Sequence, residues 1–289
     1  MCNSRFGMKV VKKVDMKIKY SILIISLFVS CFTFSQRKPK IKGSKVVVEV
    51  REELEPFNAI TLDDNLEITL KKSVNFGYSL SIDDNLVDVL KFKVVDNKLT
   101  ISSFYDITSK KKMEITVFYD NLNSITIHDG KIKTEDIVTS DALSVTTYGS
   151  SRLTLNANVT IMDVLMLENS SADLIISADS LNITLKDRID AQIYAVSKNN
   201  NLEMFKNAQV KMEGNSDIFD IHLYENASLK AENLEASDIN LTIESSASAY
   251  INALNSLSLS SKETAKTYFY GSGKINIIDF LDTSVLSKR

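Results

Sequence analysis

The sequence predicts an all-β protein built around a right-handed parallel β-helix, or β-solenoid, with a β-rich N-terminal half. The first observation is an aliphatic residue every 18 positions, in two series that lie two residues apart. These are Ile221, Ile239, Leu257 and Ile275, and Leu223, Leu241, Leu259 and Ile277. Residues two apart on a strand point to the same face. A repeat of this length is typical of one solenoid coil, which buries its apolar face only against neighbouring coils.

Composition supports the same fold class and excludes one class of partner. The chain of 289 residues has two prolines and no tryptophan, with abundant Ser, Thr, Asn, Val and Ile. That mixture favours short strands and polar turns over helices. A net charge of −3 and a pI of 5.6 argue against nucleic-acid binding, which usually needs a strongly basic face.

Residues 1–35 read as an N-terminal extension and signal peptide. Lys17 and Lys19 precede an apolar run over residues 20–34, and Ser35 offers a small residue for cleavage. Met16 is the expected true start, and residues 36–45 are a basic linker. The segment predicts export to the periplasm, the outer-membrane surface or the extracellular space.

Both cysteines, Cys2 and Cys31, lie in this N-terminal segment, so the mature chain is expected to contain no disulfide. Cys31 follows Val29 and Ser30, as at the end of a lipobox. Lipidation there is the alternative to simple cleavage, and an uncleaved anchor is a third. Contact with a membrane is expected only if Cys31 is lipidated.

Residues 46–121 contain alternating apolar and polar segments that predict strands. They are Val46–Val50, Ile60–Leu62, Leu66–Leu70, Tyr78–Ile82, Lys98–Ile101 and Met113–Val117. A short helix is expected over Leu86–Phe92. Two Asp-Asp-Asn triplets, at 63–65 and 83–85, lie between strands and favour tight turns over calcium binding. Lys110, Lys111 and Lys112 are expected in a solvated loop, with an anion-binding patch as the alternative.

Residues 122–289 repeat serially, and polar corners predict two or three strands of about three to five residues per coil. The units begin at Ile125, Leu143, Leu165, Leu181, Leu202 and Ile221. Their spacings are 18, 22, 16, 21 and 19, before the regular 18 begins. Irregular stacking between Leu143 and Ile221 makes these coils the expected location of specific function.

Several segments resemble the GIN domain, described as the head domain of auto-transporter adhesins in secreted proteins of the Bacteroidetes type. They include Phe57-Asn58-Ala59-Ile60, the segment Tyr119 to Ile125, and corners such as Tyr148-Gly149-Ser150-Ser151 and Tyr270-Gly271-Ser272-Gly273. Most corner glycines of that pattern are Ser or Asn in this chain, so its corner geometry is expected to differ. The resemblance covers residues 50–278 and implies one domain over residues 46–289, a secreted or surface location and an adhesive role. It implies no catalytic residue.

The candidate binding residues are outward-facing tyrosines, because tyrosine beside small polar residues commonly holds sugars or protein surfaces. They are Tyr148, Tyr194, Tyr224, Tyr250, Tyr268 and Tyr270; the alternative is that some of them fill the core. At an 18-residue register Asp220 and Asp238 would stack as neighbours, which makes them the candidates for polysaccharide cleavage. The alternative is that both carboxylates accept hydrogen bonds from backbone N–H groups at a coil corner. His128 and His222 lie on different coils without a third ligand, so no metal is expected, nor any cofactor.

We therefore expect an exported, non-enzymatic binding or adhesion module that recognises a glycan or a surface protein through the faces of the β-helix. One alternative is a structural envelope scaffold without a soluble ligand. The other is a polysaccharide lyase or hydrolase that uses carboxylates on neighbouring coils.

Overall fold

The computed structural model describes residues 38–289, of which Lys40–Arg289 form one compact, nearly all-β unit. The predicted signal peptide, the start at Met16 and the cysteines Cys2 and Cys31 lie outside the described residues. Within the described part, no helix is both long and apolar enough to span a membrane.

The N-terminal half is a mixed sheet that covers the first coil. Its elements are β1 (Lys40–Lys42), β2 (Val47–Glu53), β3 (Ala59–Leu62), β4 (Glu67–Lys72), β5 (Gly77–Asp83), η1 (Asp84–Val89), β6 (Leu90–Val95), β7 (Lys98–Ser103), β8 (Asp106–Ser109) and β9 (Met113–Tyr119). β5 runs antiparallel to β2 and to β9, and β6 runs antiparallel to β7. β3 and β4 pair in parallel with this sheet on one side and with the next coil on the other.

Two local expectations change in this half. The helix is a 3-10 helix over Asp84–Val89, and the chain from Leu90 is already strand β6. Segment 36–45, predicted as a linker, contains β1, which pairs in parallel with β8. That pairing brings the N-terminal segment beside a strand more than sixty residues away in the sequence.

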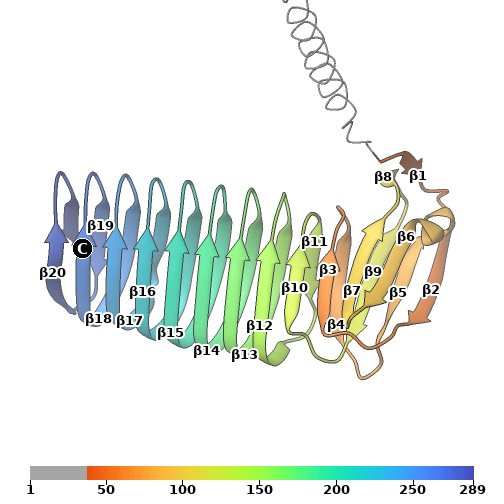
Figure 1. The fold of residues 1–289 in the computed structure, drawn as a ribbon, viewed down its shortest axis with the longest axis horizontal. Coiled ribbons are helices and arrows are strands. Elements are labelled where there is room, and N and C mark those ends of the chain that lie inside the picture. The colour runs from red at the N-terminus through yellow and green to blue at the C-terminus, as the bar shows by residue number, and fades with distance from the viewer. Residues whose placement is uncertain (1–37) are drawn as a thin grey trace, which may run out of the picture. The chain divides into compact units, whose positions relative to one another are not determined.

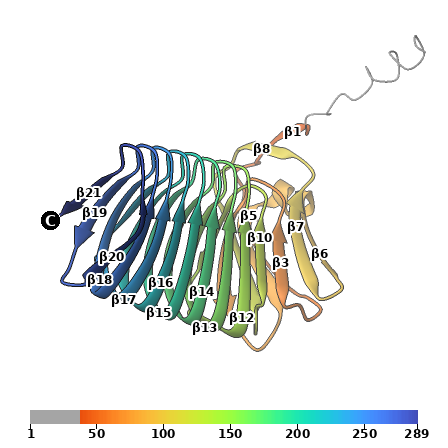
Figure 2. The same ribbon diagram turned by 60° about the vertical axis from the view of Figure 1, so that its left-hand side comes forward.

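We call the mixed sheet of the N-terminal half the cap. About nine coils follow it and form the β-solenoid that the sequence predicted. Their strands are β10 (Ser124–Ile127), β11 (Lys131–Thr134), β12 (Val138–Thr147), β13 (Arg152–Met166), β14 (Ser171–Leu185), β15 (Asp190–Met204), β16 (Gln209–Leu223), β17 (Ser228–Ile243), β18 (Ser248–Ser261), β19 (Lys266–Tyr270), β20 (Lys274–Phe280) and β21 (Val285–Lys288). From β13 to β18 one strand of 14 to 16 residues bends around each coil, instead of several short ones (Figures 1 and 2).

The coil length is 19 residues through the middle of the solenoid, as the pairings of Asp163, Asn182, Asn201 and Asp220 show. It is 20 from Asp220 to Asn240, where β17 contains a bulge, and 18 from Asn240 to Ser258. The 18-residue repeat is therefore confirmed for Ile239, Leu257 and Ile275, and for Leu241, Leu259 and Ile277.

The same repeat is wrong for the first member of each series. Ile221 lies opposite Leu241, and Leu223 lies opposite Ile243. The irregular spacings predicted between coil starts from Leu143 to Ile221 are also wrong. Side chains alternate between the two faces of a strand, so an aliphatic residue at a different position along the strand was mistaken for the first residue of a coil. Leu165, for example, is only half-buried and lies opposite the outward-facing Thr146. The coils expected to be irregular are the most regular.

Four-residue turns join the long strands, and each turn has its second residue in the left-handed region. These residues are Gly149, Glu168, Asp187, Lys206, Glu225, Ser245, Glu263 and Asp282, with φ from 58° to 79°. Seven of these eight residues are not glycine and six of them are charged, so most turns adopt the left-handed conformation without a glycine. Turn amides donate to carbonyls one coil away, as from Asn207 to Asp187 at 3.1 Å. This continuous ladder satisfies the turn backbone.

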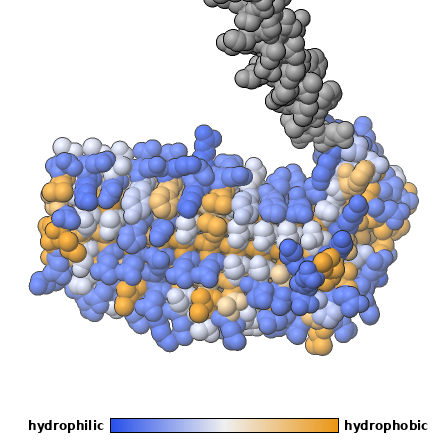
Figure 3. Space-filling view, in the orientation of Figure 1, coloured by the Kyte–Doolittle hydropathy of each residue, from blue (hydrophilic) through white to orange (hydrophobic). Residues whose placement is uncertain are grey.

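The last coil pairs with its neighbour, but its outer edge is open. β21 pairs in parallel with β19, and Leu286 packs against the core. Five apolar side chains on this edge stay exposed: Ile277, Ile278, Phe280, Leu281 and Val285. They belong to the last coils, at the left-hand end of Figure 3, where apolar surface gathers.

Asp83 fastens the N-terminal segment to the cap. Its side chain is fully buried and accepts backbone N–H groups from Lys45 at 3.0 Å, Lys111 at 3.1 Å and Lys112 at 3.1 Å. Burial alone raises the pKa of Asp83, but the amides outweigh it and lower the pKa below its ordinary value. A lowered folded-state pKa means that the carboxylate stabilises the fold above the unfolded-state pKa and loses that contribution as the pH falls through the folded-state value.

We therefore expect Asp83→Asn to lower the Tm by about 5 °C at neutral pH, because an amide cannot accept three N–H groups equally well. The difference in Tm between wild type and variant should shrink as the pH is lowered into the acid range, where Asp83 is protonated. Thermal melts followed by circular dichroism measure it. Asp88→Asn, on the exposed side of η1, is the control and should leave the Tm unchanged. Equal Tm values for the two variants at neutral pH would contradict this role of Asp83.

Candidate functional site

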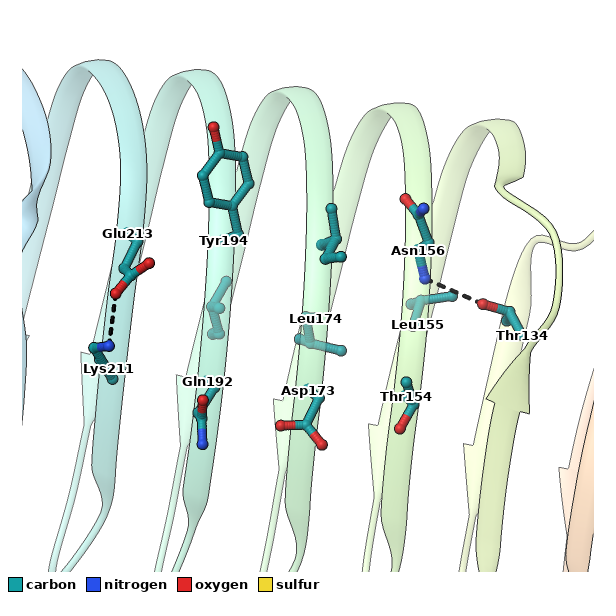
Figure 4. Close-up of a pocket in the computed structure, with 12 residues that line it drawn as sticks. Thr134, Thr154, Leu155, Asn156, Asp173, Leu174, Gln192, Tyr194, Lys211 and Glu213 are labelled. Atoms are coloured by element: carbon teal, nitrogen blue, oxygen red, sulfur yellow. Dashed lines mark hydrogen bonds and ion pairs between the residues drawn. The ribbon is translucent and has the colours of Figure 1, made fainter.

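A shallow groove of about 280 Å³ crosses the outer surface of strands β13 to β16. Parallel pairing stacks one outward residue per coil into columns. One column contains Thr154, Asp173, Gln192 and Lys211, and the next contains Asn156, Ile175, Tyr194 and Glu213. We call this surface the Tyr194 groove, and Figure 4 shows its residues side by side on successive coils.

The apolar part of the groove is Ile175 beside Tyr194. The two residues lie directly opposite each other on β14 and β15. Ile175 is 54% exposed and Tyr194 is 48% exposed, and no aromatic ring of the described residues stacks on Tyr194. Exposed apolar side chains grouped inside a polar rim commonly mark a contact surface. The open ring face of Tyr194 is therefore available to a ligand.

The rim contains charges held in pairs. Asp173 Oδ2 accepts from Arg152 Nη2 at 2.8 Å, and Lys211 Nζ lies 2.6 Å from Glu213 Oε1. Hydrogen bonding to Asp173 raises the pKa of Arg152, and hydrogen bonding to Lys211 lowers the pKa of Glu213. Arg152, Lys211 and Glu213 therefore stay charged at neutral pH, and each basic side chain of the rim lies beside a carboxylate.

Two side-chain amides add neutral hydrogen-bonding groups. The backbone N–H of Asn156 donates to Thr134 Oγ1 at 3.1 Å, which fixes this strand position and leaves its side-chain amide at the groove (Figure 4). Within the described residues the side-chain amides of Asn156 and Gln192 have no protein partner. Each amide offers both a donor and an acceptor, which is the combination that a hydroxyl-rich ligand needs.

Gly214 shapes one end of the groove. It follows Glu213 on β16 at φ +118°, and a Cβ there would lie 2.0 Å from the backbone oxygen of Ala195. Only glycine tolerates both the conformation and the approach. It is the single glycine between residues 150 and 270. The close contact positions β16 against β15 directly beside Tyr194.

The six predicted tyrosines do not form one surface, and none of them is buried. Tyr148 and Tyr224 lie in turns four coils apart; Tyr148 is tilted against His128, and Tyr224 stacks on Phe205 with ring centroids 5.1 Å apart. Tyr250 and Tyr268 stack on each other at 4.4 Å on β18 and β19, and Tyr270 ends β19. Only Tyr194 lines the groove.

The predicted stacking of Asp220 on Asp238 is wrong. Asp220 lies opposite Asn240, and Asp238 lies opposite Ile218 and Ser256, because the coil between β16 and β17 has 20 residues instead of 18. Asp220 Oδ1 accepts from Asn240 Nδ2 at 2.7 Å, and Asp238 Oδ1 accepts from Ser256 Oγ at 2.6 Å. Each carboxylate therefore takes part in a separate polar ladder between coils.

The two histidines also lie apart. His128 Nδ1 lies 2.7 Å from Asp63 Oδ1, while His222 lies between Glu203 and Thr242 on neighbouring coils. In residues 38–289 no three His, Cys, Asp or Glu side chains are grouped so that they could hold a metal ion.

Sequence reasoning found Tyr194 but missed its neighbours. Ile175, Tyr194 and Glu213 are 19 residues apart, as are Asp173, Gln192 and Lys211. A scan at this period would have aligned them, but the 18-residue repeat of the C-terminal coils hid it.

The capping sheet, the coils and the open groove define the class of the protein: a β-solenoid closed at its N-terminal end by a mixed sheet. More particularly, the chain belongs to the family described as "Putative auto-transporter adhesin, head GIN domain", which matches residues 56–273. This confirms the resemblance seen in the sequence.

Solved structures share the fold at low sequence identity. A putative adhesin from Parabacteroides merdae is 14% identical with a TM-score of 0.61, covering 87% of this chain and 99% of that one. A putative adhesin from Parabacteroides distasonis is 15% identical with a TM-score of 0.61, covering 86% and 99%. A putative lipid binding protein from the same species is 17% identical with a TM-score of 0.60 and the same coverage. No curated protein is significantly similar to the chain.

Proposed function

We propose that the protein is an exported, non-enzymatic binding or adhesion module that recognises glycans through the Tyr194 groove. The observation that carries the proposal is the exposed ring of Tyr194 beside unpaired amide side chains, in a depression of about 280 Å³. The family's description as an adhesin head supports a binding role and a location at the cell surface or beyond.

The groove offers the contacts that a sugar uses. Sugar rings present a face of C–H groups that packs on an aromatic ring, and hydroxyl groups that pair with amides and carboxylates. Tyr194 and Ile175 would contact the C–H face, and Gln192 and Asn156 would bind the hydroxyls. The paired charges of the rim favour a neutral glycan over a strongly acidic one, because an anion would meet Asp173 and Glu213 as well as Arg152 and Lys211.

The carboxylates of the groove support binding more than hydrolysis. Glycoside cleavage needs a general acid whose pKa is raised so that it holds a proton. The pKa of Glu213 is lowered, and Asp173 forms an ion pair with Arg152. Neither carboxylate therefore has the environment of a general acid.

An array of glycans and matrix proteins, probed with residues 36–289, tests the proposal. We expect retention on a subset of neutral glycans, with no new reducing ends after incubation. Retention only on proteins would move the function to protein adhesion, and release of reducing ends would make the protein an enzyme. A chain that is folded by circular dichroism and retained on nothing would contradict the proposal and favour an envelope scaffold.

A further inference from the structure

Charge is distributed unevenly along the chain. Residues 1–45 contain 11 Lys and Arg against one Asp or Glu, whereas residues 46–289 contain 23 against 36, a net charge of −13. Five of the basic residues lie between residues 37 and 45, directly after the apolar run of residues 20–34. Residues 46–289 are therefore acidic, and the N-terminal segment of residues 1–45 is basic.

The fold adds a second basic segment to the first. β1 pairs with β8, and the loop after β8 contains Lys110, Lys111 and Lys112. Asp83 accepts the backbone N–H groups of Lys45, Lys111 and Lys112, so three lysine backbones converge on one buried carboxylate. We call the lysines at 40, 42, 45, 110, 111 and 112 the basic end. β1 and β8 lie together at the capped end of the unit in both ribbon views (Figures 1 and 2).

The acidic groups at this end are few and mostly engaged. Asp83 is buried, Glu114 pairs with Lys112 at 3.0 Å, and Asp84 accepts from Ser44 Oγ. Asp106 lies opposite Lys40 on β8. The side chains of Lys42, Lys45 and Lys111 are exposed and have no acidic partner within ion-pair distance among the described residues.

Apolar side chains accompany the charge. Val46 follows Lys45 and is 57% exposed, and Phe104, two residues before β8, is 55% exposed. Exposed apolar groups beside lysines are the combination with which peripheral proteins contact a bilayer: lysines meet anionic headgroups, and apolar groups enter the interface.

We propose that the basic end binds the surface of a bilayer that contains anionic phospholipid. The apolar run of residues 20–34 supports a bilayer as the binding partner. As a signal peptide, this run would place the basic segment that follows it next to a membrane during export. The acidic segment of residues 46–289, at −13, is repelled by the same surface. Binding at one end and repulsion along the coils would hold the solenoid away from the membrane and leave the Tyr194 groove free.

Vesicle co-sedimentation of residues 36–289, which contain the whole compact unit, tests the proposal. Wild type should sediment with vesicles containing about one third phosphatidylglycerol, and not with pure phosphatidylcholine vesicles. The variant Lys42→Gln, Lys45→Gln, Lys111→Gln should bind at least about tenfold more weakly. Salt at about 0.5 M should release the wild type.

The matched control is Lys131→Gln, Lys133→Gln, Lys230→Gln, which removes three exposed charges from the coils. It should bind the anionic vesicles nearly as tightly as wild type, because the coils do not contact the bilayer and their charges are screened by salt. If both triple variants lose the same affinity for anionic vesicles, net charge alone determines vesicle binding, and the proposal is overturned. Absence of wild-type binding to anionic vesicles, or equal binding to neutral ones, would overturn it too. Melting curves of each variant exclude misfolding as the cause of a loss.

Discussion

Replacement of Gly214 by alanine is expected to destabilise the solenoid by about 3 kcal/mol or more, because two penalties coincide at this residue. The φ of +118° disfavours any L side chain, and the new Cβ would lie 2.0 Å from the backbone oxygen of Ala195. Backbone cannot move aside as a flexible side chain does, so β15 and β16 must separate locally.

Denaturant unfolding followed by circular dichroism measures the effect of Gly214→Ala. Asn215→Ala, at the next and exposed position, is the control and should change the unfolding free energy by less than about 0.5 kcal/mol. A Gly214→Ala protein within about 1 kcal/mol of wild type would contradict the close approach of the two coils. Because the substitution adjoins Glu213, the variant should also lose glycan binding.

Phe219→Ala is expected to cost about 3–5 kcal/mol, the second large effect. Phe219 is fully buried on β16, opposite Asn200 on one coil and Ile239 on the next, and is among the largest buried side chains. Stacked coils cannot collapse easily into the cavity, because their backbones are fixed by hydrogen bonds on both sides. Phe219→Leu keeps much of the volume and should cost less than about 1.5 kcal/mol.

The same unfolding experiment checks Phe219, with Phe104→Ala as the control for loss of an exposed ring. Phe104 is 55% exposed, so its removal should cost under about 1 kcal/mol. Similar losses for Phe104→Ala and Phe219→Ala would mean that residue 219 does not face the core, and that the assigned register of β16 is incorrect.

The strand period of two made the fold class predictable, but it could not determine the register. Alternating Ile and Leu mark the inward face of most coils, so the solenoid was evident from buried residues such as Leu241, Leu257 and Leu259. Register depends on counting through turns, and the bulge in β17 changes the coil length from 19 to 20 at that point. The error placed Asp220 beside Asp238 and concealed the column of Ile175, Tyr194 and Glu213.

Local propensity also failed where tertiary contacts decide the conformation. Glu168, Lys206 and Glu225 adopt the left-handed conformation that sequence rules assign to Gly or Asn. The backbone carbonyl of each accepts an N–H group from the turn of the following coil, so the stack compensates a strained residue. The convergence of Lys45 and Lys111 on Asp83 was equally out of reach, because it joins segments far apart in the chain.

The central claim is that the ring of Tyr194 provides a large part of the affinity of the groove for a glycan. Titration calorimetry with the best glycan from the array should show at least about a tenfold loss of affinity for Tyr194→Ala, since a lost stacking contact removes about 1–2 kcal/mol. Tyr250→Ala removes a tyrosine that stacks on Tyr268 elsewhere on the coils, and should bind as wild type does. Full affinity of a folded Tyr194→Ala protein, or an equal loss in Tyr250→Ala, would contradict the assignment of the groove as the binding site.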